Sequence, residues 1–202
     1  MIPTNHSAKR LLLILVAALL AGAIAGGAEP SSAPDVSTLS SASANKLALR
    51  NNAASLLDQL LSEEKGVHYV LLIKGHRAVL QQLIKKISAT TAAAQEQLRA
   101  LAKTDPSLNL RAIELPAGEK ATRAAIQDTE EHELLFTSGA DFEFTLLLAQ
   151  ANALGYGWHL AQIAADNSTS PAETKAFAAL SASLQDLYQQ TVALIRSPPP
   201  AK

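Results

Sequence analysis

Apolar residues recur at helical spacing in several separate segments of the chain. The first segment carries Leu49, Ala53, Leu56, Leu57 and Leu60. Their intervals of three and four residues are typical of the buried face of an amphipathic helix. This pattern predicts a helix that begins near residue 44.

Three further stripes have the same period and predict three more helices. They comprise Val79, Leu80, Leu83, Ile84, Ile87, Ala94, Leu98, Leu101 and Ala102; Phe142, Leu146, Ala149, Ala153, Tyr156, Leu160 and Ile163; and Phe177, Leu180, Leu184, Leu187, Thr191 and Leu194. Pro106 ends the first of these. A weaker helix follows Pro116, and its apolar positions are mostly alanine until Leu134.

Two of the predicted helices have a recognisable start. Ser138 stands at an N-cap position, with Asp141 in the first turn near the positive end of the helix dipole. Ser170-Pro-Ala-Glu173 matches a capping box with proline at the first helical position. We therefore expect Ser170 to accept from the backbone N–H of Glu173, and the Glu173 side chain to reach back to the N–H of Ser170.

Residues 66–75 fit two descriptions. The segment alternates, is rich in β-branched residues and lies between Gly66 and Gly75, which favours a strand. A single strand, however, leaves its backbone groups unpaired. A helix that follows the first stripe is the favoured interpretation. The predicted fold is all-α, an antiparallel bundle of four or five helices over residues 44–197.

The N-terminal end of the chain predicts export, and neither end is predicted to belong to the folded domain. Lys9-Arg10, the apolar run 11–25 and the small residues up to Ala28 have the order of a secretory signal peptide. The run is shorter than the roughly 20 residues that span a bilayer, so cleavage before Glu29 is favoured over retention as a membrane anchor. Residues 29–43 are rich in Ser, Ala and Pro and predict a flexible linker, and residues 198–202 form a proline-rich tail.

Composition narrows the classes of function. The net charge is −1, and removal of residues 1–28, which include Lys9 and Arg10 but no acid, lowers it to −3. A surface this close to neutral argues against nucleic-acid binding. The chain has no cysteine, which excludes disulfides and thiolate chemistry. These features predict a periplasmic or secreted protein that contacts the membrane only if the signal peptide is retained.

Acids and histidines one helical turn apart are the candidate metal ligands. Glu64 precedes His68 by four residues, Asp128 precedes His132 by four, and His159 lies in the next predicted helix. Such pairs either share a metal ion or form surface charge pairs. Surface pairs are the favoured interpretation, and no cofactor is expected.

A glycine-containing stretch in the fourth stripe is the other candidate. Gly155 and Gly157 each cost about 1 kcal/mol relative to alanine inside a helix. Close approach of a second helix, with Trp158 filling the space above it, is the favoured explanation. The functional alternative is a small aromatic pocket built from Tyr69, Tyr156 and Trp158. The sequence has no Gly-x-Ser-x-Gly nucleophile motif and no phosphate-binding glycine loop.

Three segments carry a resemblance to a known family. They are Leu134-Leu-Phe-Thr-Ser-Gly-Ala-Asp-Phe142 followed by Leu146-Leu147 and Ala149-Gln150; Thr174-Lys-Ala-Phe-Ala178 followed by Leu184; and Gln95-Glu-Gln-Leu98 with Leu101-Ala102. Over residues 50–195 the chain resembles exported bacterial proteins of domain of unknown function 4142. The resemblance implies a ferritin-like helical bundle, exported or envelope-associated, with no established activity.

The chain departs from that family at its histidines. Thr90-Thr91 stand where the family has an Asp-His pair, and two further family histidines fall on Leu154 and on Leu187 or Tyr188. These departures lower the expectation of a metal site. The predicted function is a non-enzymatic binding or structural module whose partners are envelope components or a second copy. A ferritin-like metal-binding or redox protein is the alternative.

Overall fold

The computed structural model of the chain describes residues 36–72 and 74–197. Within these ranges the chain is all-helical and has no strand, which confirms the predicted helical bundle. The elements are α2 (Val36–Glu64), the 3-10 helix η1 (Val67–Leu72), α3 (Ala78–Thr104), α4 (Ala117–Phe136), α5 (Gly139–Asp166) and α6 (Pro171–Ile195). The expected signal peptide, the first part of the linker and the proline-rich tail lie outside the described residues.

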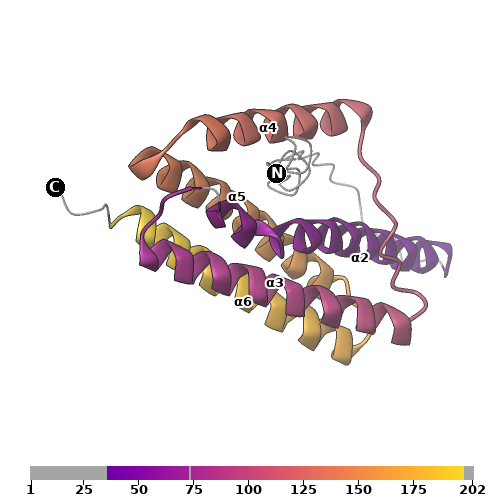
Figure 1. Ribbon diagram of the computed structural model, residues 1–202. Coiled ribbons are helices and arrows are strands. Elements are labelled where there is room, and N and C mark those ends of the chain that lie inside the picture. The colour runs from indigo at the N-terminus through magenta and orange to yellow at the C-terminus, as the bar shows by residue number, and fades with distance from the viewer. Residues whose placement is uncertain (1–35, 73, 198–202) are drawn as a thin grey trace, which may run out of the picture.

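Four helices, α2, α3, α5 and α6, form the bundle, and α4 connects its two halves (Figure 1). Helices α2 and α3 are antiparallel, as are α5 and α6. The loop 105–116 and α4 carry the chain back along the length of the bundle, so α3 and α5 begin at the same end. An ion pair between Arg77, at the start of α3, and Glu143, in the first turns of α5, joins these two starts.

The predicted apolar stripes form the core. The largest fully buried side chains come from all the long helices and include Leu57, Leu61, Leu80, Ile84, Leu134, Phe142, Leu154, Phe177 and Leu184. Three residues of the stripes, Leu49, Val79 and Ile163, remain largely exposed. Val79 and Ile163 lie in the terminal turns of α3 and α5, where fewer neighbouring helices cover them, whereas Leu49 lies near the middle of α2.

Helix α4 is attached to the bundle more loosely than the others. Leu134, near its C-terminal end, is its buried residue, and the ribbon of α4 lies apart from α2 along much of its length (Figure 1). The Lys74 ammonium donates to the carbonyl oxygens of Leu135 (2.6 Å) and Thr137 (2.9 Å). A cation at the C-terminus of a helix complements its dipole, so this contact fastens the end of α4.

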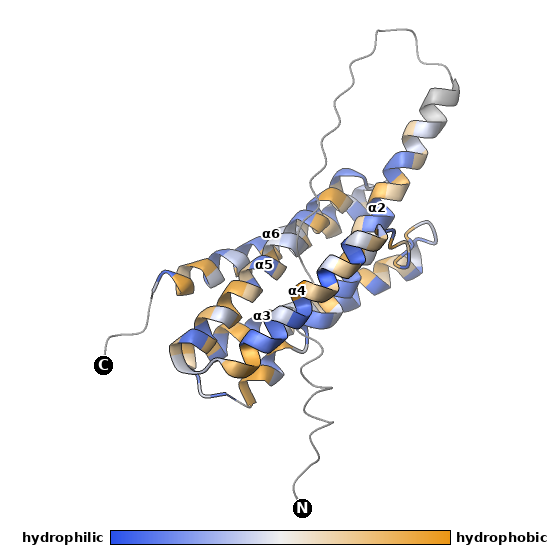
Figure 2. Ribbon diagram, turned by 90° about the horizontal axis from the view of Figure 1, so that it is seen from above, coloured by the Kyte–Doolittle hydropathy of each residue, from blue (hydrophilic) through white to orange (hydrophobic). Residues whose placement is uncertain are grey.

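Two segments differ from their sequence predictions. Residues 67–72 form a 3-10 helix, so the helix favoured for 66–75 is present but short, and these six residues are not a strand. Helix α2 begins at Val36, so residues 36–43 of the expected flexible linker are helical. Ser and Ala are compatible with a helix, and adding turns to an existing helix avoids the cost of nucleation. These turns extend beyond the other helices (Figure 2), and residues 41–46 are exposed.

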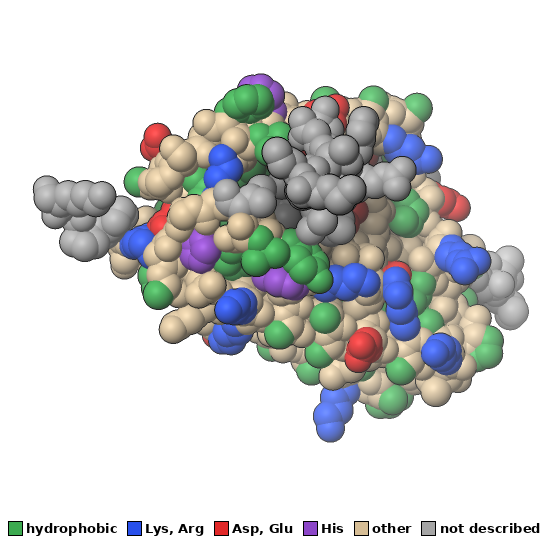
Figure 3. Space-filling view, in the orientation of Figure 1, with side chains coloured by type: hydrophobic (Ala, Val, Ile, Leu, Met, Phe, Trp, Pro, Cys, Tyr) green, Lys and Arg blue, Asp and Glu red, His purple; other side chains and the backbone are tan. Residues whose placement is uncertain are grey.

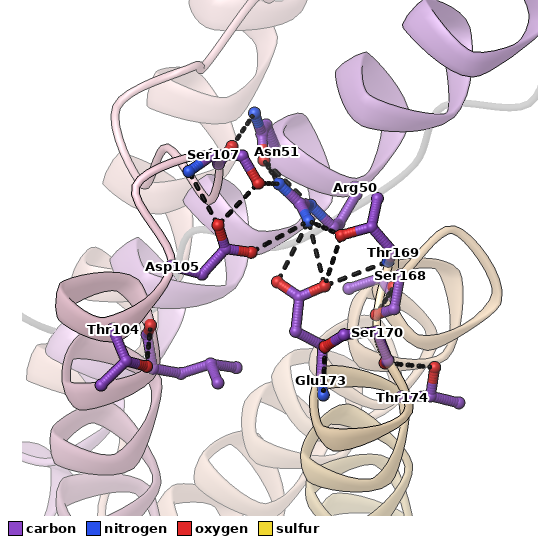
Figure 4. A network of polar contacts seen from close by, with 12 residues as sticks. Arg50, Asn51, Thr104, Asp105, Ser107, Ser168, Thr169, Ser170, Glu173 and Thr174 are labelled. Carbon is purple, nitrogen blue, oxygen red and sulfur yellow. Dashed lines mark hydrogen bonds and ion pairs between the residues drawn. The ribbon is translucent and has the colours of Figure 1, made fainter.

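A buried arginine ties together one end of the bundle (Figure 4). Arg50 of α2 is 0 % exposed, and its Nη1 donates to both carboxylate oxygens of Glu173 at 3.0 Å. The same guanidinium contacts Thr169 (2.9 Å), Ser107 (3.0 Å) and Asp105 (3.5 Å). One side chain therefore joins α2 to the end of α3, the loop after it and the start of α6.

The predicted caps are correct in position and differ in detail. Ser138 is the N-cap of α5 but makes no cap hydrogen bond through its side chain. Ser170 caps α6 and accepts from the Glu173 N–H at 3.2 Å, as predicted. The return bond was wrong by one residue, because Glu173 accepts from the N–H of Thr169 at 3.0 Å. Arg50 and Thr169 hold the same carboxylate, which aims it away from the N–H of Ser170.

Candidate functional site

A cleft of about 290 Å³ lies where α4 faces the bundle. Helix α2, the loop after α3, α4 and α5 all contribute to it. Its apolar wall is formed by Leu56, Leu60, Ile113, Leu115 and Ala124. Its polar residues are Gln59, Lys120, Arg123, Gln127 and Tyr156. A mainly apolar wall with a few placed polar groups is the usual composition of a ligand site.

Arg123 is held firmly at this cleft. Its Nε donates to Glu119 at 2.7 Å, and its Nη2 donates to the Tyr156 hydroxyl at 2.9 Å. The guanidinium carbon lies 5.1 Å from the centroid of the Tyr156 ring, within the range of a cation–π contact. Burial disfavours the charged form, but the contacts with Glu119 and Tyr156 outweigh it and raise the pKa of Arg123. Its charge and its orientation are therefore both fixed.

Lys120 lies one turn before Arg123 on α4 and is exposed. Its side chain makes no hydrogen bond or ion pair with any described residue. Residues three apart on a helix are neighbours on its surface. The cleft thus combines one fixed cation with one that is free to move.

A group of buried polar side chains occupies the next turns of the same three helices. Glu64, the last residue of α2, is 2 % exposed, and Gln150 of α5 is 0 % exposed. Neither oxygen of Glu64 and neither polar atom of Gln150 makes a well-formed hydrogen bond. The Gln150 amide nevertheless lies close enough to favour the ionised form of the Glu64 carboxyl. A buried polar group without a partner is uncommon and costs stability.

Burial dominates the acid–base behaviour of this group. It raises the pKa of Glu64 to about 8, with further increases from the charges of Glu63 and Glu130. Burial, followed by the charge of Glu133, raises the pKa of Glu130 to about 7. Glu64 and Glu63 also stand at the negative end of the α2 dipole, which disfavours a carboxylate there. The group therefore holds protons near neutral pH.

The three aromatic residues of the predicted pocket do not come together. Tyr156 faces Arg123 and the cleft, whereas Trp158 stacks on His159 and lies 5.9 Å from the Tyr188 ring of α6. Side chains two positions apart on a helix, such as those of Tyr156 and Trp158, point in nearly opposite directions. Tyr69 is half-exposed on η1 and contacts His68. Tyr156 alone of the three lines the cleft.

The candidate metal ligands are also spread over the molecule. The His68 Nδ1 lies 2.7 Å from the Ser88 hydroxyl of α3, and Asp128 and His132 are exposed on α4. His159 is exposed on α5 beside Trp158. Among residues 36–72 and 74–197, no three His, Cys, Asp or Glu side chains are placed to hold a metal ion. Glu64 is the one candidate of the five that is buried.

Sequence reasoning missed the buried positions of Arg50, Glu64 and Gln150. Each lies at an interval of three, four or seven residues from core leucines or alanines of its own helix. Arg50 precedes Leu57 by seven, Glu64 follows Leu60 by four, and Gln150 follows Leu146 by four. A polar residue in step with an apolar stripe is the signal that identifies such positions.

The rest of the surface shows less organisation. On the face in Figure 3, Lys and Arg side chains are spread among acids and apolar groups rather than gathered into one patch. Large apolar side chains are exposed where α4 meets α5, at Leu135, Phe136, Phe144 and Leu148. No helix among the described residues is long and apolar enough to cross a membrane.

No family model, curated protein or solved structure matches this chain. Membership of the family that the sequence resembles therefore stays a prediction.

Proposed function

We propose that this chain is an exported periplasmic or envelope-associated helical-bundle protein that acts as a non-enzymatic binding module. The cleft beneath α4 is its binding site. The observation that carries this proposal is the combination of an apolar wall with the unpaired Lys120 and the fixed Arg123 in one concave site. The order of charge, apolar run and small residues over positions 9–28 supports export.

A ferritin-like arrangement of the bundle is part of the proposal. In that arrangement, two antiparallel helix pairs are joined by one long crossover connection. Here the loop 105–116 and α4 form such a crossover between α3 and α5. The crossover element also covers the cleft, so it is the part of the fold best placed to move when a ligand enters.

The residues of the cleft favour binding over catalysis. They supply cations, amides and a phenol, and the Tyr156 hydroxyl already accepts from Arg123. A nucleophilic or general-base mechanism needs a nucleophile within hydrogen-bond reach of a base. The cleft offers donors in place of such a pair.

Two measurements test the proposal. The protein recovered from the periplasmic fraction should begin at Glu29 by mass spectrometry, and an intact Met1 contradicts cleavage. In a ¹H–¹⁵N NMR screen of small organic compounds, the compounds that bind should shift the amide resonances of Leu60, Ala124 and Tyr156. If no compound binds, or if the shifts fall elsewhere, the cleft is not the binding site.

A metal-binding function is the second candidate, because the charges of Glu63 and Glu130 both act on the buried carboxyl group of Glu64. Two findings count against it: the candidate histidines are spread over the molecule, and no three His, Cys, Asp or Glu side chains of the described residues are placed to hold a metal ion. Elemental analysis of protein purified from the periplasm separates the two functions. Stoichiometric iron, manganese or zinc would replace the binding-module proposal with this one.

A further inference from the structure

We propose that the cleft beneath α4 takes a small amphipathic organic anion, a carboxylate on a compact apolar body. This inference rests on the proposed function of the cleft as a binding site, and it adds the chemical class of the ligand. Three independent features lead to it: the charge of the cleft, the hydrogen-bond donors of the cleft that have no partner among the described residues, and the size of the cleft.

The charge of the cleft is positive. Lys120 and Arg123 both line it, and the described residues of its lining include no Asp or Glu. Glu119, on the same face of α4, is paired with Arg123 and offsets its charge, so the surplus positive charge of the cleft is that of Lys120. Gln59 and Gln127 donate their amides to Glu63 and Glu131, one turn farther along. An anionic group is therefore favoured beside Lys120 and Arg123 and disfavoured toward the end of α2.

The hydrogen-bonding groups at the cation end are donors. The Tyr156 oxygen accepts from Arg123 Nη2, which leaves the phenol proton available. The Arg123 Nη1 has no partner among the described residues, and Lys120 has three unused N–H groups. These three side chains can all donate to one ligand head. A carboxylate, which only accepts and does so at several positions, satisfies them together.

The size of the cleft limits the apolar part of the ligand. At roughly 30 Å³ of liquid volume for each water, a cleft of about 290 Å³ has room for about ten non-hydrogen atoms. The wall that receives this part is aliphatic, with Leu56 and Leu60 on one side and Ile113 and Leu115 on the other. A medium-chain fatty acid such as octanoate matches both the volume and the chemistry.

Three probes with the same chain and different heads test the assignment: octanoate, 1-octanol and octylammonium. Their dissociation constants are measured by NMR titration of the purified protein near neutral pH. Octanoate should bind about tenfold or more tightly than the other two, because only its head satisfies the cations and donors. Lys120→Gln and Tyr156→Phe should each weaken octanoate about fivefold or more and leave octanol unchanged.

Two further variants locate the effect. Lys85→Gln removes an exposed lysine of α3 outside the cleft and should leave every probe unchanged. Ala124→Phe fills the cleft from an exposed position of α4 and should abolish binding of all three probes, with an unchanged melting curve as proof of folding.

The outcomes that overturn the inference differ from those that overturn the proposed function. If octanol binds as tightly as octanoate, and Lys120→Gln changes neither, the cleft binds ligands but not as an anion site. If no probe shifts the cleft resonances, or if octanoate still binds Ala124→Phe, the cleft is not the binding site and both proposals fail.

Discussion

Gly157 lies where side chains of both α2 and α6 pack directly against the backbone of α5. A Cβ atom added there would stand 2.6 Å from Leu60 Cδ2 and 3.3 Å from Leu184 Cδ1, both in the core. At Gly155 the nearest atoms belong to the Tyr188 ring, at an ordinary 3.6 Å. The close packing that the sequence suggested is therefore present at Gly157, and at Gly155 it is not.

Alanine substitutions at the two glycines should have different effects on stability. Gly155→Ala should stabilise by up to about 1 kcal/mol, the difference in helix propensity. Gly157→Ala gains the same propensity but overpacks the core, which typically costs about 1–3 kcal/mol, so it should be neutral to destabilising. Urea unfolding of the two variants measures the difference. If both substitutions stabilise the protein equally, the side chains of Leu60 and Leu184 can move aside without a loss of stability.

The two N-cap serines, Ser138 and Ser170, allow a second comparison of substitutions. Ser170→Ala removes a bond that the structure contains and should cost about 0.5–2 kcal/mol, whereas glycine there should cost only a few tenths. Ser138→Ala removes a hydroxyl that makes no cap bond and should cost clearly less. Thermal or urea unfolding tests this order. A Ser138 variant as damaging as the Ser170 variant would contradict the assigned cap geometry.

Some residue roles were predictable from sequence and others were not. The N-cap positions and the close approach at Gly157 follow from local rules, because their causes lie within a few residues. The burial of Arg50 depends on Glu173, which lies more than a hundred residues away in the sequence. The burial of Glu64 depends on residues of two other helices. Local sequence places them on the apolar stripe but does not supply those partners.

At the scale of the element, the end of α2 and α4 each carry a buried or half-buried carboxyl group with a raised pKa, Glu64 and Glu130. The folded-state pKa of Glu64 is about 8, against an ordinary value of 4.5. The folded protein therefore binds more protons than the unfolded chain between these values. By linkage, the free energy of unfolding falls as pH rises through this window. Glu130, with a pKa of about 7, adds to the decrease over the lower part of the window.

Glu64→Gln should remove most of this pH dependence. The amide keeps the size of the side chain and can pair with Gln150, but it never ionises. Near pH 4 the variant and the parent should be about equally stable, and near pH 9 the variant should be more stable by a few kcal/mol. Urea unfolding across this range provides the measurement. Parallel stability curves would mean that Glu64 is not the buried acid responsible.

The elements themselves were largely predictable. The stripes placed α3, α5 and α6 correctly because each carries leucines at regular helical intervals over its length. A helix was the favoured prediction for the segment that contains 67–72, because a single strand has no pairing partner, but its 3-10 form and its short length were not predicted, since its residues favour a strand locally. The early start of α2 was missed because a Ser/Ala-rich segment with no apolar stripe leaves no periodic pattern.

At the scale of the whole molecule, the cleft depends on topology rather than on any one segment. It is assembled from α2, the loop 105–116, α4 and α5. The stripes predict which face of each helix is buried but not which helices are neighbours. The crossover course of α4 decides that Lys120 and Arg123 face Leu56 and Leu60, and no local pattern encodes this course. The candidate site therefore became visible only in the folded structure.

The hydrogen bonds and ion pairs of Arg50 should make a large contribution to stability at the end of the bundle remote from Glu64. Arg50→Met leaves Glu173 buried without its cation, and removing one partner of a buried pair typically costs about 3–5 kcal/mol. The double variant Arg50→Met with Glu173→Leu removes both charges and should be more stable than Arg50→Met alone. Urea unfolding of the parent, the two single variants and the double variant gives the coupling energy between Arg50 and Glu173.

Hydrogen exchange distinguishes a local role of Arg50 from a global one. Arg50 contacts the end of α3, the loop after it and the start of α6 at once. In Arg50→Met, the backbone amides of the non-proline residues within 105–108 and 169–174 should therefore lose protection first, while those around Glu64 and Gln150 keep theirs. Uniform loss over the whole bundle would mean that the molecule unfolds as one cooperative unit, and that Arg50 contributes only to its total stability.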